Sequence, residues 1–121
     1  MTPAERNQIY KELENKYRPY MTIEGIPYIE KGTRWQYQMH IYESPFYYID
    51  YCLAQTVALG FLVMMNEDYN NALNKYIAFV KSGGTKLFST LVKEAEIPNP
   101  FGDGTLKVLA EKLNKILESY N

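Results

Sequence analysis

The sequence holds few of the residues that build metal centres or disulfide frameworks. Its 121 residues include one cysteine, Cys52, and one histidine, His40. One cysteine cannot form a disulfide within the chain, and catalytic zinc sites use three protein ligands that commonly include two or three histidines. The His-Glu-x-x-His zinc motif is absent as well. We therefore expect no cofactor in this chain, and we interpret Cys52, inside an apolar stretch, as a buried and unreactive thiol.

The sequence also lacks an excess of either charge and a long hydrophobic run. Its 13 basic and 14 acidic side chains give a net charge of -1, which leaves no basic surface for a phosphate backbone. The longest mostly apolar stretch, from Cys52 to Met65, contains Gln55 and Thr56 and is shorter than a membrane span. The polar residues 1–8 form no signal-peptide core. We expect neither nucleic acid nor membrane as a partner, and we expect a cytoplasmic protein.

The patterning that is present is helical. Thr2 and Glu5 form a capping box in front of a helix from about Pro3 to Tyr17. Residues 18–32, with two prolines and two glycines, indicate an irregular connector. The secondary structure of residues 34–42 stays open, because their aromatic residues fit neither helical nor strand spacing.

The longest predicted helix follows these residues. Ser44 is a candidate cap with Pro45 at the first helical position, and the apolar run predicts a helix that continues to Met65. At about 20 residues this helix would be about 30 Å long, enough to cross the domain as its buried centre.

Helical spacing predicts three further helices towards the C-terminus. One is capped by Asn66, a short one starts at Thr85 with Leu87 on its inward face, and an amphipathic one begins between Asp103 and Thr105. No segment alternates as a strand would. The predicted fold class is all-α, a bundle of about five helices with a long buried central helix, in one domain of residues 1–121.

Tyrosine is the surplus in this composition. The chain has 12, and six fall between positions 28 and 51. In a helix that begins at Pro45, Tyr48 and Tyr51 share a face while Tyr47 points elsewhere. Phenols and a histidine N–H are donors that can stabilise a developing oxyanion. The same rings could instead simply fill an aromatic core with their hydroxyls at its edge, and the residues alone favour that interpretation without excluding the other.

At these residues the sequence resembles a known family. The resemblance is to the zinc metallopeptidases of the oligoendopeptidase F and thimet oligopeptidase type, and within them to the Pz-peptidase-like branch. The matching text is Trp35, His40-Ile41-Tyr42, Pro45-Phe46-Tyr47-Tyr48-Ile49-Asp50-Tyr51 and Leu53-Ala54-Gln55. By this resemblance residues 34–121 correspond to the C-terminal lobe of such an enzyme, and residues 1–33 form an N-terminal helix and a connector.

The resemblance implies a mostly helical enzyme that hydrolyses short peptides, with zinc held by a His-Glu-x-x-His motif and a downstream glutamate. It implies that His40 contacts the substrate and that Tyr48 and Tyr51 match a pair of substrate-side tyrosines three residues apart. Tyr48 is the first choice as oxyanion donor, and His40 assists it in stabilising the transition state. Tyr42 is implied in substrate binding. Zinc is the cofactor of complete members, whereas this chain has no zinc-binding motif.

The resulting hypothesis is a truncated oligoendopeptidase F-like protein that keeps substrate-side residues and is inactive alone. One alternative is half of a split peptidase that another chain completes. A second is a non-catalytic module that binds a peptide or protein through tyrosine-rich contacts. The expected partners are short peptides or a missing upstream peptidase half. Apolar surfaces left bare by the truncation also predict a homo-oligomer.

Overall fold

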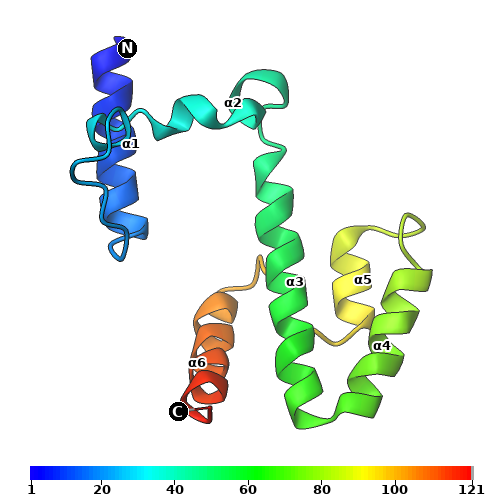
Figure 1. Cartoon of the computed structure of the whole chain (residues 1–121). Coiled ribbons are helices and arrows are strands. Elements are labelled where there is room, and N and C mark those ends of the chain that lie inside the picture. Colours follow the sequence, from blue (N-terminus) through cyan, green and yellow to red (C-terminus); the bar gives the residue numbers. More distant parts are fainter. Residues whose placement is uncertain (121) are drawn as a thin grey trace. The chain divides into compact units, whose positions relative to one another are not determined.

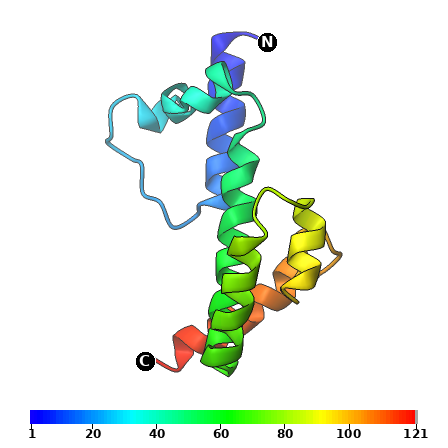
Figure 2. The same ribbon diagram turned by 90° about the vertical axis from the view of Figure 1, so that its right-hand side faces the viewer.

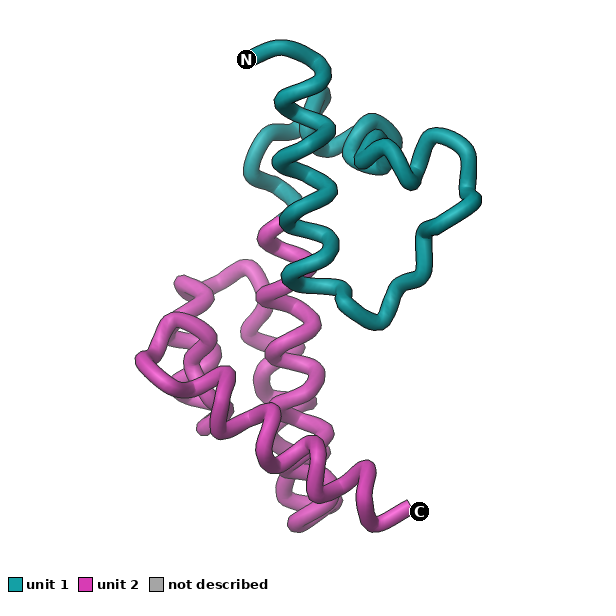
Figure 3. Tube along the Cα trace, turned by 90° about the vertical axis from the view of Figure 1, so that its left-hand side faces the viewer, with its two compact units in different colours: residues 1–48 teal, residues 49–121 magenta. Residues whose placement is uncertain are grey.

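The computed structural model describes residues 1–120, and within them every regular secondary-structure element is a helix (Figure 1). This confirms the all-α fold class. The α-helices and the two 3-10 helices are α1 (Pro3–Tyr17), η1 (Ile29–Lys31), η2 (Arg34–Tyr37), α2 (Met39–Glu43), α3 (Tyr48–Glu67), α4 (Tyr69–Lys81), α5 (Phe88–Glu94) and α6 (Thr105–Glu118). The chain divides into two compact units, residues 1–48 (unit 1) and residues 49–121 (unit 2), shown in separate colours in Figure 3.

Unit 1 is organised around α1, which has the predicted bounds. The Thr2 hydroxyl accepts from the Glu5 backbone N–H at 3.3 Å, and the Glu5 carboxylate accepts from the Thr2 N–H at 2.6 Å. This capping box satisfies two donors at the helix start. The connector leaves α1 and returns beside it (Figure 2). It returns at Gly32, where φ is +75° and a Cβ would overlap the Asn7 carbonyl oxygen, so the close approach requires glycine.

The segment between the connector and α3 contains short helices and a turn. Residues 34–42, whose secondary structure the sequence pattern does not decide, form η2 and most of α2. The Tyr47 N–H then donates to the Ser44 carbonyl at 3.1 Å, with Pro45 at the second turn position and Phe46 at a φ of +70°. The prediction of a helix from Pro45 was wrong, because proline suits the second position of a β-turn as well as the first turn of a helix.

The junction between α3 and α4 also differs from the prediction. Helix α3 runs to Glu67, and the Asp68 carboxylate accepts from the Asn71 N–H at 3.1 Å, so Asp68 rather than Asn66 caps α4. Asp and Asn are about equally good caps, so composition alone did not decide between them. Leu87 is likewise the N-cap residue of α5 and is exposed, not inward-facing. Helix α6 begins at Thr105, within the predicted range of Asp103 to Thr105.

Unit 2 is built on α3. Helices α3 and α4 form an antiparallel hairpin that α5 packs against, and α6 lies on the side of α3 away from α4 (Figures 1 and 2). The core cluster is Val57, Phe61, Val92, Ala95 and Ile97. The Phe61 ring meets the edges of Tyr76 and Phe79 at centroid distances of 5.3 and 5.6 Å. Within residues 1–120, every buried apolar side chain belongs to unit 2.

The expected burial of the central helix is only partial. Four residues of α3 are buried, namely Val57, Gly60, Phe61 and Val63, because α4, α5 and α6 cover only part of its circumference. Cys52 is exposed, which corrects the prediction of a buried thiol. At 20 residues α3 is longer than the apolar stretch read from the sequence, and by length and composition alone it could cross a membrane. Core helices of soluble proteins meet the same test, although only 22% of the tested α3 window is buried.

Candidate functional site

The candidate site in unit 1 is a group of aromatic rings around His40. His40 lies on α2 and is half-buried. Its imidazole stacks on Tyr47 at a centroid distance of 5.8 Å and meets the tilted ring of Tyr48 at 5.0 Å. Tyr47 closes the turn before α3 and Tyr48 is the first residue of α3, so the turn places both phenols beside the imidazole. We call His40, Tyr47 and Tyr48 the aromatic triad.

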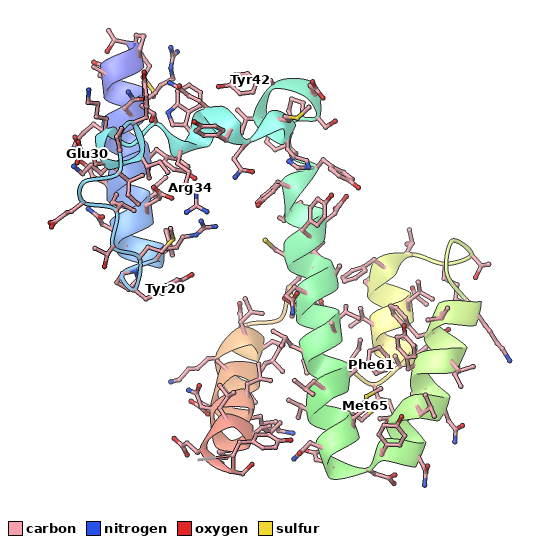
Figure 4. All side chains as sticks on the ribbon, in the orientation of Figure 1. Tyr20, Glu30, Arg34, Tyr42, Phe61 and Met65 are labelled. Atoms are coloured by element: carbon pink, nitrogen blue, oxygen red, sulfur yellow. The ribbon has the colours of Figure 1, made fainter. Side chains whose placement is uncertain are left out.

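A second aromatic pair connects this segment to α1. Tyr42, labelled in Figure 4, stacks on Trp35 at a centroid distance of 6.0 Å. The indole N–H of Trp35 donates to the Asn7 side chain at 2.9 Å, and the Arg6 guanidinium lies over the indole ring at 5.7 Å. A hydrogen bond and a cation–π contact therefore fix Trp35 on α1, and Trp35 supports Tyr42.

A buried ion pair fixes the start of η2 on the same helix. The Glu14 side chain on α1 is 8% exposed, and its Oε1 accepts from the Arg34 guanidinium at 3.3 Å. Arg18 lies 4.0 Å from the same oxygen, and Arg34 also contacts the Met21 sulfur at 3.2 Å. Figure 4 shows Arg34 beside α1. Since Glu14 is shielded from water, this pair holds η2 against α1, and through it residues 35–48, which we call the aromatic segment.

The carboxylate of Glu14 also affects a neighbouring phenol. Burial raises the pKa of Tyr10 above its ordinary value of 10.0, and the negative charge of Glu14 raises it further. Arg34 and Arg18 lower this pKa, while Tyr48 raises it slightly. Tyr10 therefore keeps its proton to a higher pH than a free tyrosine does and is a neutral hydroxyl at physiological pH.

The structure places the rings of His40 and Tyr48, two of the predicted site residues, in contact. Tyr42 shares α2 with His40 but stacks on Trp35, and Tyr51 belongs to unit 2. The predicted helix from Pro45 placed Tyr47 on a different face from Tyr48 and Tyr51, whereas in the structure its ring stacks on His40. The position of Tyr47 would follow from interpreting Ser44-Pro45 as the start of a β-turn, since proline is favoured at the second position of type I and type II turns alike.

The triad presents polar donors but no metal-binding set. Two phenol hydroxyls and an imidazole can donate to a carbonyl oxygen or to the oxyanion formed from it. Among residues 1–120 no three histidine, cysteine, aspartate or glutamate side chains cluster in a way that could hold a metal ion. A zinc ion therefore does not fit the described donor set, and the chemistry open to these residues is binding and stabilisation of charge.

Phe46, next to the triad, sits in a conformation that costs energy. Its φ of +70° is the left-handed region, where the third position of a type II turn normally carries glycine. The ring is 94% exposed, so no packing within the chain offsets the strain. A left-handed conformation costs a residue with a side chain about 1–2 kcal/mol.

We expect Phe46→Gly to stabilise unit 1. Glycine removes the strain but adds about 0.4–1 kcal/mol of unfolded-state entropy, so the free energy of unfolding should rise by about 0.5–1 kcal/mol. Urea denaturation followed by fluorescence of the single tryptophan, Trp35, measures this change. Phe46→Ala, which keeps the strained φ, is the control and should gain nothing. A less stable glycine variant would show that the ring itself stabilises the turn.

Comparisons with known proteins identify relatives of much greater length. No protein-family profile matches the chain, and no curated protein matches it. A solved structure assigned to oligoendopeptidase F is 40% identical, with a TM-score of 0.87 over 98% of this chain and 21% of its own. A structure of Pz peptidase A with an inhibitor is 42% identical, with a TM-score of 0.86 over the same shares. The chain thus spans about one fifth of the relatives that it matches.

Proposed function

We propose that the chain, which is 40–42% identical to oligoendopeptidase F and Pz peptidase over the 21% of their length that it spans, forms the substrate-side helical lobe of a peptidase of that type. In this proposal the chain binds a short peptide and stabilises the transition state of its hydrolysis. The zinc ion is held by residues outside the described chain. The contact of His40 with Tyr47 and Tyr48 is the observation that carries the proposal.

Each predicted site residue has a separate task in this proposal. The Tyr48 hydroxyl donates to the oxyanion that develops on the scissile carbonyl, where a donor placed in advance is most effective. The His40 imidazole contacts the peptide backbone and orients Tyr48 through their ring contact. Tyr42 and Tyr51, both exposed, contact the substrate at positions away from the reacting bond. None of these steps requires a metal ligand from this chain.

The ion pair and the indole contacts support this role by fixing the segment. The aromatic segment has no buried apolar residue of its own, so its position depends on Trp35 bonded to Asn7 and on Arg34 paired with Glu14. Donors act on a transition state only when they are held in place before the reaction. The anchoring on α1 supplies that order.

The test measures peptide hydrolysis when the chain is combined with the zinc-binding part of an oligoendopeptidase F. A truncated oligoendopeptidase F that keeps its zinc-binding region but lacks the fifth matched by this chain is co-expressed with it. With wild-type chain we expect cleavage of a fluorogenic peptide. Tyr48→Phe should lower kcat by about 10²-fold with little change in KM, because it removes one oxyanion donor and no ground-state contact.

Two controls accompany this assay. Tyr37→Phe removes an exposed phenol of the same segment and should leave kcat unchanged. The isolated chain should neither hydrolyse the peptide nor retain stoichiometric zinc in metal analysis. Zinc-dependent activity of the isolated chain would contradict the proposal. Unchanged kcat in Tyr48→Phe would remove Tyr48 from the oxyanion role and favour a non-catalytic peptide-binding module.

A further inference from the structure

Unit 2 contains an apolar groove that the proposed function does not use. Helices α3, α4 and α5 enclose a groove of about 710 Å³. Figure 4 shows Phe61 and Met65 pointing from α3 towards α4 and α5, on the side where the groove lies. The remaining lining is almost entirely apolar, and Asp50 is its one charged residue. Small-molecule sites usually add several convergent polar groups, so this lining favours an apolar surface of a protein as the occupant.

Helix α3 leaves most of its apolar surface uncovered. It is apolar around most of its circumference, yet only 22% of its most apolar window is buried. Helices that are hydrophobic on all sides normally lie inside a larger protein or a membrane. Leu62, which lines the groove, is 46% exposed although leucine gains about 1.5–3 kcal/mol from full burial.

The size of the relatives identifies the occupant. They match this chain over 98% of its length while it covers only 21% of theirs, so about four fifths of their fold has no counterpart here. We propose that the α3–α4–α5 groove is the docking surface for an apolar helix from that remaining part of an oligoendopeptidase F-type peptidase. The inference rests on the proposed function, because it takes the zinc-carrying part as the partner.

A second copy of this chain fits the groove less well. In a two-fold dimer the same patch faces itself, and two concave grooves cannot fill each other. A protruding helix face fills such a groove, as in helix-in-groove recognition.

The test measures complex formation and not catalysis. The probe is the co-expressed oligoendopeptidase F lacking the matched fifth, and the readout is a one-to-one complex by size-exclusion chromatography with light scattering. Leu62→Glu should weaken the complex at least about 100-fold, because it places an unpaired charge in an apolar interface. Leu62→Ser gives a milder change at the same exposed position and should weaken it about tenfold.

A matched control comes from the other side of α3. Leu117→Glu makes the same substitution on α6 at a site that is 64% exposed and does not line the groove, and it should leave the complex intact. Tyr48→Phe should also bind normally. A wild-type complex that forms but does not hydrolyse the peptide would therefore count against the proposed function and not against the docking surface.

The other outcomes overturn the inference. The groove is not the docking surface if the complex forms equally well with Leu62→Glu, or if the probe stays insoluble and unbound beside the wild-type chain. Self-association of the isolated chain that Leu62→Glu abolishes would assign the groove to a second copy. Sedimentation with phosphatidylcholine vesicles that Leu62→Glu abolishes would assign it to a membrane.

Discussion

Replacing Arg34 with methionine is expected to lower the free energy of unfolding of unit 1 by about 3 kcal/mol. Removing one partner of a buried ion pair costs about 3–5 kcal/mol, because the other charge stays buried without compensation. Here the Glu14 side chain is 8% exposed and Arg34 is 28% exposed. The loss falls at the lower end of that range, because the partly exposed arginine gains less from the pair and Arg18 lies 4.0 Å from the same carboxylate.

The fluorescence of Trp35 is a direct probe of this effect. Trp35 is the only tryptophan, and it belongs to η2, as Arg34 does, so urea denaturation followed by its emission reports on unit 1. The double variant Glu14→Leu/Arg34→Met removes both charges and should recover most of the loss, since apolar replacement of a whole buried pair is often neutral or stabilising. If Arg34→Met alone were neutral, the pair would contribute nothing and η2 would be held by the Trp35 contacts.

Phe61→Ala is expected to cost unit 2 about 3–5 kcal/mol, the usual loss for truncating a buried phenylalanine. The ring is 4% exposed and lies in the core cluster with Val57 and Val92. It also makes two edge contacts, with Tyr76 at 5.3 Å and Phe79 at 5.6 Å, and such aromatic pairs contribute about 0.5–1.5 kcal/mol each beyond burial. Alanine would remove both contacts and leave a cavity beside α4.

Helical circular dichroism during urea denaturation measures this loss. Phe61→Leu keeps an apolar side chain and should lose less than half as much, so it stays measurable if the alanine variant does not fold. Leu117→Ala, at an exposed position of α6, is the matched surface control and should change the stability by no more than about 0.5 kcal/mol. Equal losses at the two positions would show that Phe61 is not part of a packed core.

Local signals explain most of what could be predicted from the sequence. The capping box of Thr2 and Glu5 defined α1, because every interaction in it lies within one helical turn. The start of α6 was found from its amphipathic spacing, because its N-cap residue, Gly104, makes no side-chain capping hydrogen bond. Ser44-Pro45 misled because the dipeptide is common both at helix starts and in turns. Only the φ of +70° at Phe46 separates the two cases, and no neighbouring residue encodes it.

The candidate site was predicted less completely, because its support is not local. The resemblance predicts functional roles for His40 and Tyr48, and the structure places their rings in contact. Tyr47 was missed because its orientation depends on the turn. The pairing of Arg34 with Glu14 joins residues 20 positions apart, and neither hydrophobic periodicity nor a motif indicates such a pair. The exposure of α3 likewise depends on which helices cover it.

The distribution of buried apolar side chains has a thermodynamic consequence. They lie in unit 2 among residues 1–120, whereas the buried residues of unit 1 include Glu14 and Thr33 and no apolar side chain. The heat-capacity increase on unfolding arises mainly from apolar surface becoming hydrated. Unit 2 should therefore carry most of it, with a stability curve that bends strongly with temperature. Unit 1 depends on charge and hydrogen bonding, so its stability should vary more gently with temperature.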